Sequence, residues 1–186
     1  MSLFPTRTEI TRFNEASDII KWREKISESL KTNDNDDAYI SLENDDILSK
    51  NKVSDLFVDI LQWLLPHKGL VDCEVISYVV PDFREYWDAE TVEEYSDKTF
   101  PEEITSYLQI NFPSGNFATF LPSGPNIVGD NYEEYFAEVN LRMRQRRLVL
   151  VLKNKDSSWE CVLYHGVRVP LEFTPFNEVA LKKFLF

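Results

Sequence analysis

Apolar positions follow a helical period in two early parts of the chain. In residues 17–31 apolar side chains recur every three or four positions, which predicts an amphipathic helix. Residues 53–65 show the same period with more apolar side chains, and the run ends at Pro66, so a second helix is expected there. A polar, acidic loop over residues 32–37 separates the two, and residues 38–42 after it are expected to form a short strand.

Later in the chain the apolar residues are patterned as in strands. Residues 71–80 are rich in β-branched side chains, which predicts a largely buried strand. Residues 104–112 and 116–121 flank a Pro-Ser-Gly turn and predict a β-hairpin. The unbroken apolar run 148–152 predicts a central strand, and residues 159–165 predict the next one.

Three further segments complete the predicted fold. Residues 131–146 are expected to form a helix, residues 167–173 a last strand, and Thr174-Pro175 the start of a C-terminal helix that runs through Leu185. No βαβ alternation, internal repeat or linker is visible. The prediction is a single α+β domain over residues 1–186, with a mostly antiparallel sheet packed against N-terminal, central and C-terminal helices.

Composition supports one soluble folded domain. The 186 residues are 43% hydrophobic and 13% aromatic, which is enough to build a core without disulfides or metals. No apolar run approaches the ~18 residues of a membrane-spanning helix, and the first residues lack a hydrophobic signal core, so a cytoplasmic protein without a membrane partner is expected. Cys73 and Cys161 fit reduced, buried thiols in that compartment, with a single disulfide as the alternative.

The net charge of the chain indicates which class of partner it could bind. The formal net charge is −12, which disfavours direct binding to nucleic acid and favours a basic protein. The charge is uneven along the chain, because residues 1–141 hold 28 acidic and 11 basic side chains, whereas residues 142–186 hold 4 acidic and 9 basic ones. The sequence does not determine the oligomeric state; a monomer is favoured, and pairing of two chains through a strand edge is the alternative.

Candidate catalytic chemistry is sparse. The chain has only two histidines: His67 follows a predicted helix end, where a histidine commonly caps carbonyl groups, and His165 follows Cys161 by four residues. In a strand that spacing separates thiol and imidazole by roughly 13 Å, which excludes a nucleophile pair. Metal-ligand spacings, phosphate-binding glycine motifs and a complete calcium loop are absent, and residues 34–37 share only the charge of such a loop. No catalytic residue, metal or cofactor is therefore predicted.

Acidic residues recur beside aromatic ones. Tyrosine and tryptophan are preferred anchors of protein interfaces, and adjacent carboxylates can pair with arginine or lysine on a partner. The alternative is that these aromatics belong to the core and the acids to the solvated surface beside them. The predicted partner-binding residues are Tyr86, Trp87, Asp88, Glu93, Glu94, Tyr95, Tyr132, Glu133, Glu134 and Tyr135.

A basic cluster interrupts this acidic pattern at Arg142, Arg144, Arg146 and Arg147. These side chains could grip phosphates or a carboxylate-rich partner. The favoured interpretation is structural, because basic residues in the last turn of a helix complement its dipole and the acidic remainder of the chain offers ion-pair partners.

Size, acidity, missing catalytic motifs and clusters such as Tyr132-Glu133-Glu134-Tyr135 resemble bacterial toxin-immunity proteins, including those of contact-dependent growth inhibition. The resemblance covers the general character of the chain and no family motif. It implies a protein-binding inhibitor that neutralises a basic toxin, such as a nuclease, by covering its cationic site.

Two other classes of function stay open. One is a nucleic-acid mimic, in which surface carboxylates imitate phosphates. The other is a small-ligand domain or enzyme whose site is assembled from dispersed residues such as Asp72, Glu74, Tyr78 and His165.

Overall fold

A computed structural model describes residues 8–31, 40–81, 102–123, 135–144, 146–153, 158–164 and 173–186. The helices are α1 (Ala16–Lys31), α2 (Ile40–Leu64), the short 3-10 helix η1 (Leu65–His67) and α3 (Glu178–Leu185). The strands are β1 (Thr8–Arg12), β2 (Asp72–Pro81), β3 (Glu102–Asn111), β4 (Phe117–Ser123), β5 (Tyr135–Met143), β6 (Arg146–Lys153), β7 (Trp159–Tyr164) and β8 (Thr174–Pro175).

All eight described strands form one antiparallel sheet whose spatial order is the sequence order, β1 to β8. The helices α1 and α2 are inserted between β1 and β2, so β1 pairs with a strand that follows it by some sixty residues, as in the pair Arg12 and Glu74. The predicted fold class, α+β with a mostly antiparallel sheet and N-terminal, central and C-terminal helices, is confirmed.

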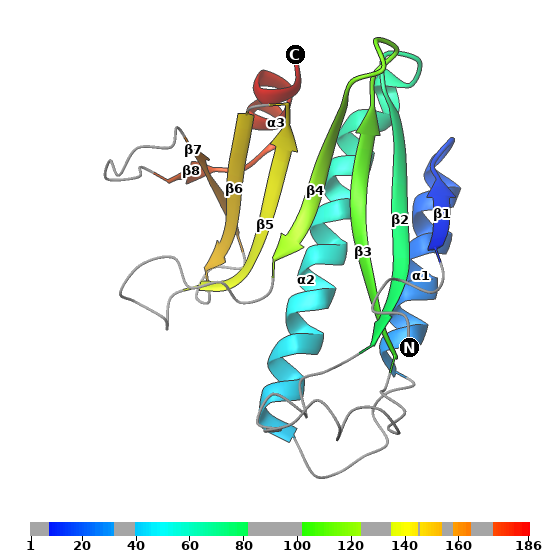
Figure 1. Ribbon diagram of the computed structural model, residues 1–186, viewed down its shortest axis with the longest axis vertical. Helices are drawn as coiled ribbons and strands as arrows, with labels where there is room; N and C mark the ends of the chain where they lie inside the picture. The colour runs from blue at the N-terminus through cyan, green and yellow to red at the C-terminus, as the bar shows by residue number, and fades with distance from the viewer. Residues whose placement is uncertain are drawn as a thin grey trace, which may run out of the picture.

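The helices lie on one face of the sheet, behind the strands in Figure 1. The core between the two layers is built from α2 and from every second residue of the central strands, and Trp22 of α1 stacks on Phe57 of α2 at a ring distance of 6.3 Å. Each fully buried large apolar side chain contributes roughly 1.5–3 kcal/mol. The fully buried ones include Phe57, Ile60, Leu64, Leu108, Phe120, Leu141 and Leu150.

Most predicted elements are confirmed. The two N-terminal helices are α1 and the C-terminal part of α2, and the strand over residues 71–80 is β2. The predicted hairpin is the β3–β4 pair, whose turn places Gly115 at φ 79°, a left-handed conformation that glycine adopts without strain. The strands over 148–152 and 159–165 are β6 and β7.

The predicted helix over residues 131–146 is wrong, because this part of the chain holds β5 and the start of β6. Val139, Leu141 and Met143 alternate with polar residues. These three apolar side chains pack in the core with α2 and the neighbouring strands. The same residues also fit a helical period, but β4 and β6 pair with β5 on both sides, and this pairing favours the strand.

Three smaller predictions also need correction. The short strand over residues 38–42 is wrong, because α2 begins at Ile40. The C-terminal helix begins at Glu178, where the Asn177 side chain caps it by accepting a hydrogen bond from the Ala180 amide at 3.0 Å, and Thr174–Pro175 instead forms β8. Strand β1 was not predicted, and the predicted strand over 167–173 lies almost wholly outside the described residues.

None of the helices in the described ranges is long and apolar enough to cross a membrane. Cys73 and Cys161 are free thiols. Burial raises the pKa of the Cys73 thiol to about 12, to which the nearby Asp72 charge adds, and burial also raises the pKa of the Cys161 thiol.

Candidate functional site

The sheet face that α1 and α2 do not cover, which faces the viewer in Figure 1, carries a row of polar side chains across the strands. Residues that pair directly across antiparallel strands lie on the same face. The pairing register therefore places one continuous row on this open face, defined here as the polar row: Arg12, Glu74, Gln109, Thr119, Arg142 and Arg147.

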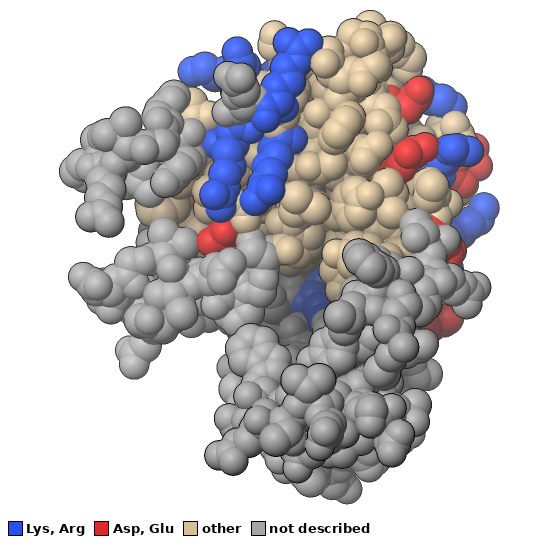
Figure 2. Space-filling view, viewed as in Figure 1, with Lys and Arg blue, Asp and Glu red and all other residues tan. Residues whose placement is uncertain are grey.

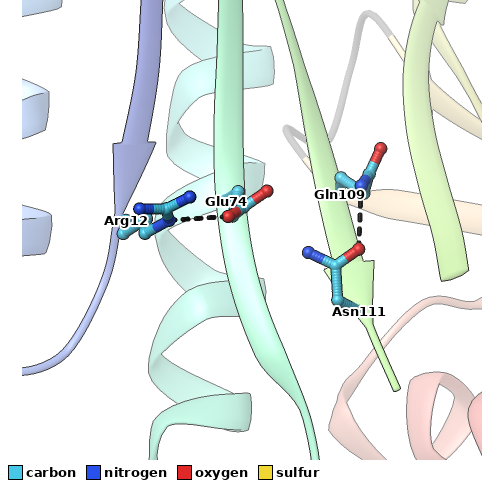
Figure 3. Close-up of polar contacts among 4 residues, drawn as sticks. All are labelled: Arg12, Glu74, Gln109 and Asn111. Carbon is cyan, nitrogen blue, oxygen red and sulfur yellow. Dashed lines mark hydrogen bonds and ion pairs between the residues drawn. The ribbon is translucent and has the colours of Figure 1, made fainter. Parts of the chain in front are cut away.

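At the β1 side of the open face, the polar row consists of paired groups (Figure 3). Arg12 donates from Nε to Glu74 Oε1 at 2.8 Å, and Gln109 donates from Nε2 to Asn111 Oδ1 at 2.8 Å. The hydrogen bond and the negative charge of Glu74 raise the pKa of Arg12. The first contact joins β1 to β2, and the second satisfies polar groups along β3. Both therefore have a role in the fold and need no ligand to explain them.

At the β5–β6 side the polar row becomes basic. Arg142 and Arg147 are direct cross-strand partners, and Arg144 occupies the turn between the strands with φ 53°. Arg144 donates from Nε to the side-chain oxygen of Asn116 at 3.1 Å. Arg142, Arg144 and Arg147 are named here the arginine strip, and Figure 2 shows Lys and Arg side chains gathered over these strands.

A nearly buried polar pair holds one member of the arginine strip. Arg147 donates from Nε to Asn140 Oδ1 at 2.6 Å, and Asn140 donates from Nδ2 to Glu138 Oε1 at 2.7 Å. Glu138 and Asn140 are only 5% and 4% exposed, and Arg147 Nη2 lies 3.9 Å from Glu138 Oε1. Arg147 is thus fixed in place while 39% of its side chain stays exposed.

The interpretation of the basic cluster as the last turn of a helix is wrong, because there is no helix at these residues. Helix-dipole compensation therefore does not explain Arg142, Arg144, Arg146 and Arg147. The alternation of apolar and basic residues from Leu141 to Arg144 is the sequence signal that could have identified an open strand face with exposed arginines.

Apolar side chains on the open face are exposed next to these polar groups. Phe117 is 54% exposed and Ile10 51% exposed, and the rings of Tyr78 and Tyr107 lie 6.2 Å apart. Phe117 and Thr119 lie on the same face of β4, and Thr119 is the direct cross-strand partner of Arg142. An exposed aromatic ring therefore borders the arginine strip.

The predicted partner-binding residues are almost all outside the described residues. Tyr135 is the first residue of β5, while Tyr86, Trp87, Asp88, Glu93, Glu94, Tyr95, Tyr132, Glu133 and Glu134 fall in the ranges 82–101 and 124–134. The strand ends that bound these two ranges are described. Pro81 pairs with Glu102, and Ser123 pairs with Glu138, so both ranges connect strands at the same end of the sheet.

The dispersed residues considered for a small-ligand site do not converge in the described part. Asp72, Glu74 and Tyr78 share the open face of β2, but six residues along a strand separate Asp72 from Tyr78 by roughly 20 Å. Glu74 is bonded to Arg12, and His165 lies outside the described ranges. His67, at the end of η1, has its ring tilted by 54° against that of Phe186, with the ring centroids 6.4 Å apart.

The described residues also form no roomy pocket or metal-binding cluster that could serve as a small-molecule site. A pocket between Phe13, Leu61, Lys68 and Cys73 has room for about one water molecule. No three His, Cys, Asp or Glu side chains of the described ranges are grouped so that they could hold a metal ion. What the described residues do present is a sheet face with exposed charged and aromatic side chains at β1–β4 and at the arginine strip. Beside the strip on the same face, Val149, Val151 and Val162 are buried in a second apolar cluster against which Phe173 packs.

Comparison with known proteins adds no assignment to this geometry. The chain matches no protein-family model, no curated protein and no solved structure.

Proposed function

We propose that the protein is a cytoplasmic, immunity-type inhibitor that binds a basic toxin, such as a nuclease, and covers its cationic site. The net charge of −12 supports a basic partner, because opposite charges steer the two proteins together and speed their association. A stoichiometric inhibitor needs fast association, since its target acts catalytically.

The observation that carries the proposal is where the acidic and aromatic segments attach to the sheet. The chain leaves at Pro81 and returns at Glu102, and it leaves again at Ser123 and returns at Tyr135. These strand ends share one end of the sheet, which is opposite to the end that holds the turns at Gly115 and Arg144. Carboxylates from both segments can therefore act on one partner.

The proposed contacts are made by Glu93, Glu94, Glu133 and Glu134 to arginine or lysine of the toxin, with Tyr86, Trp87, Tyr132 and Tyr135 as aromatic anchors. Inhibition follows by exclusion, because a substrate cannot reach a groove that the inhibitor occupies.

The test is affinity capture from the native cell followed by an activity assay on the captured protein. We expect the chain to capture a basic protein encoded by a neighbouring gene and to suppress its toxicity. The double variant Glu133→Lys with Glu134→Lys should bind this protein more weakly and with a smaller dependence on salt.

A matched control carries the same change of charge elsewhere. Glu24 and Glu28 are exposed on α1, so the variant Glu24→Lys with Glu28→Lys alters the net charge equally without touching the proposed segments. Equal weakening by both double variants would contradict the proposed contact residues, and capture of no basic protein would contradict the function.

A further inference from the structure

Two members of the arginine strip, Arg142 and Arg144, have no carboxylate partner among the described residues. Arg12, Arg23, Lys25 and Lys182 each contact a carboxylate, and Arg147 has one at 3.9 Å. In the described ranges, no carboxylate lies within ion-pair distance of Arg142 or of Arg144, whose bond goes to the Asn116 amide oxygen. The exposed Arg146 and Lys183 have none in these ranges either, so what distinguishes the strip is the placement of its arginines together on one hairpin.

Two features of the strip work against folding. Arg142 and Arg147 are directly opposite each other, and like charges in this position repel. Arg144 has φ 53°, which is the sole positive φ of a residue other than glycine in the described ranges and is strained for a side chain of this size. Such costs concentrated at one exposed place are typical of a binding site.

We propose that the arginine strip, together with Phe117, binds an acidic segment of a partner protein. Guanidinium groups form paired hydrogen bonds with carboxylates, and neighbouring strands are ~4.8 Å apart, so Arg142 and Arg147 reach the same or successive carboxylates of one segment. Phe117, 54% exposed beside Asn116, supplies an aromatic anchor of the kind that dominates interfaces.

The positions of these groups make the strip rigid before it binds. Asn116 holds Arg144, and the Glu138 and Asn140 pair holds Arg147, so two of the three guanidinium groups are already oriented. Binding then costs little side-chain entropy. Arg142, exposed and without a described partner, completes the site when the carboxylates arrive.

A protein segment fits the strip better than a nucleic acid does. A polynucleotide gains affinity from many phosphate contacts along its path, whereas the strip offers three arginines on a chain of net charge −12 that repels a long polyanion. A short acidic segment needs only the strip itself.

This inference does not depend on the proposed inhibitor function. The strip repels a basic toxin, and it lies near the turn end of the sheet, whereas residues 82–101 and 124–134 connect strands at the other end. Tyr135 and Arg142 are seven positions apart along β5, a distance of roughly 23 Å. The two partners would use different parts of the molecule.

The experiment measures binding of a fluorescein-labelled peptide that contains three glutamates and one leucine, by anisotropy at low salt. The full chain should bind it, and Arg142→Glu should bind it at least tenfold more weakly. Lys21→Glu is the matched control, because Lys21 is exposed on α1, distant from β5 in Figure 1, and the charge change is equal; its affinity should stay within twofold.

Arg144→Asn is the second variant, since asparagine tolerates a positive φ and the substitution removes the guanidinium charge. It should also weaken the peptide. Absence of binding by the full chain, or equal weakening by Lys21→Glu, would overturn the proposal. So would tighter binding of a twenty-nucleotide oligothymidylate, which would assign the strip to nucleic acid instead.

Discussion

Replacing Arg142 with glutamate should stabilise the protein while it removes part of the arginine strip. Arg142 lies directly opposite Arg147 in the β5–β6 pair, so the variant exchanges a repulsive cross-strand pair for an attractive one. Each such pair changes the free energy of unfolding by roughly 0.2–1 kcal/mol. The variant removes the repulsion between two arginines and adds the attraction between a glutamate and an arginine. The expected gain in the free energy of unfolding is about 1 kcal/mol.

Thermal unfolding followed by circular dichroism measures this gain. For a chain of this length 1 kcal/mol corresponds to roughly 2–4 °C, so Tm should rise by about 3 °C for Arg142→Glu and by about half of that for Arg142→Gln, which removes only the repulsion. In 1 M salt, where the screening length falls to about 3 Å, most of the difference should disappear.

A fall in Tm for Arg142→Glu would contradict a repulsive cross-strand pair between Arg142 and Arg147. If residues 131–146 formed the helix that the sequence suggested, a glutamate near its C-terminal end would oppose the helix dipole and destabilise the protein. The sign of the change therefore distinguishes the strand from the helix, and a gain in stability with a loss of peptide binding would separate the binding role of Arg142 from folding.

Three further predictions follow from the core, the buried polar pair and the thiol. Phe57→Ala should lower the free energy of unfolding by about 3–5 kcal/mol, measured by urea denaturation, because Phe57 is 1% exposed; an exposed control, Ile20→Ala at 59% exposure, should change it little. Arg147→Met should cost about 2 kcal/mol in the same assay, because its hydrogen bond to the buried Asn140 is charge-assisted; no change would contradict that geometry. The Cys73 pKa of about 12 exceeds that of a thiol in the unfolded chain, so on raising the pH the unfolded chain loses this proton first. The free energy of unfolding should therefore fall above about pH 9, by about 1.4 kcal/mol per pH unit from this group. Cys73→Ala should show a smaller fall over the same range, and identical slopes would contradict the shift.

The sequence predicts those elements whose pattern has a single interpretation. The long helical period before Pro66 and the β-branched run of β2 have no competing arrangement, and both are confirmed. Strand β5 shows the limit, because Tyr135, Val139 and Met143 fit a helix while Val139, Leu141 and Met143 fit a strand. The choice is made by β4 and β6, which pair with it on both sides.

Strand β1 could not be predicted for a related reason. Thr8–Arg12 has one large apolar residue, Ile10, and that side chain is 51% exposed, so the segment carries no hydrophobic pattern of its own. Its strand conformation depends on pairing with β2, to which the Arg12 and Glu74 ion pair contributes. Long-range pairing of this kind leaves little local signal.

The candidate site was misjudged for the same reason as β5. At a helix end, four basic residues within six positions would compensate the helix dipole. In a hairpin, Arg142 and Arg147 instead lie side by side on the open face of the sheet. The acidic and aromatic clusters, in contrast, remain predictions, since all but Tyr135 lie outside the described residues.

The most direct test of the inhibitor function is the growth of cells that express the captured basic protein, with and without this chain. If the chain is the proposed inhibitor, growth stops without it, resumes when it is co-expressed, and resumes less with Glu133→Lys and Glu134→Lys than with the α1 control variant. Growth that is equally poor with and without the chain would contradict the inhibitor function.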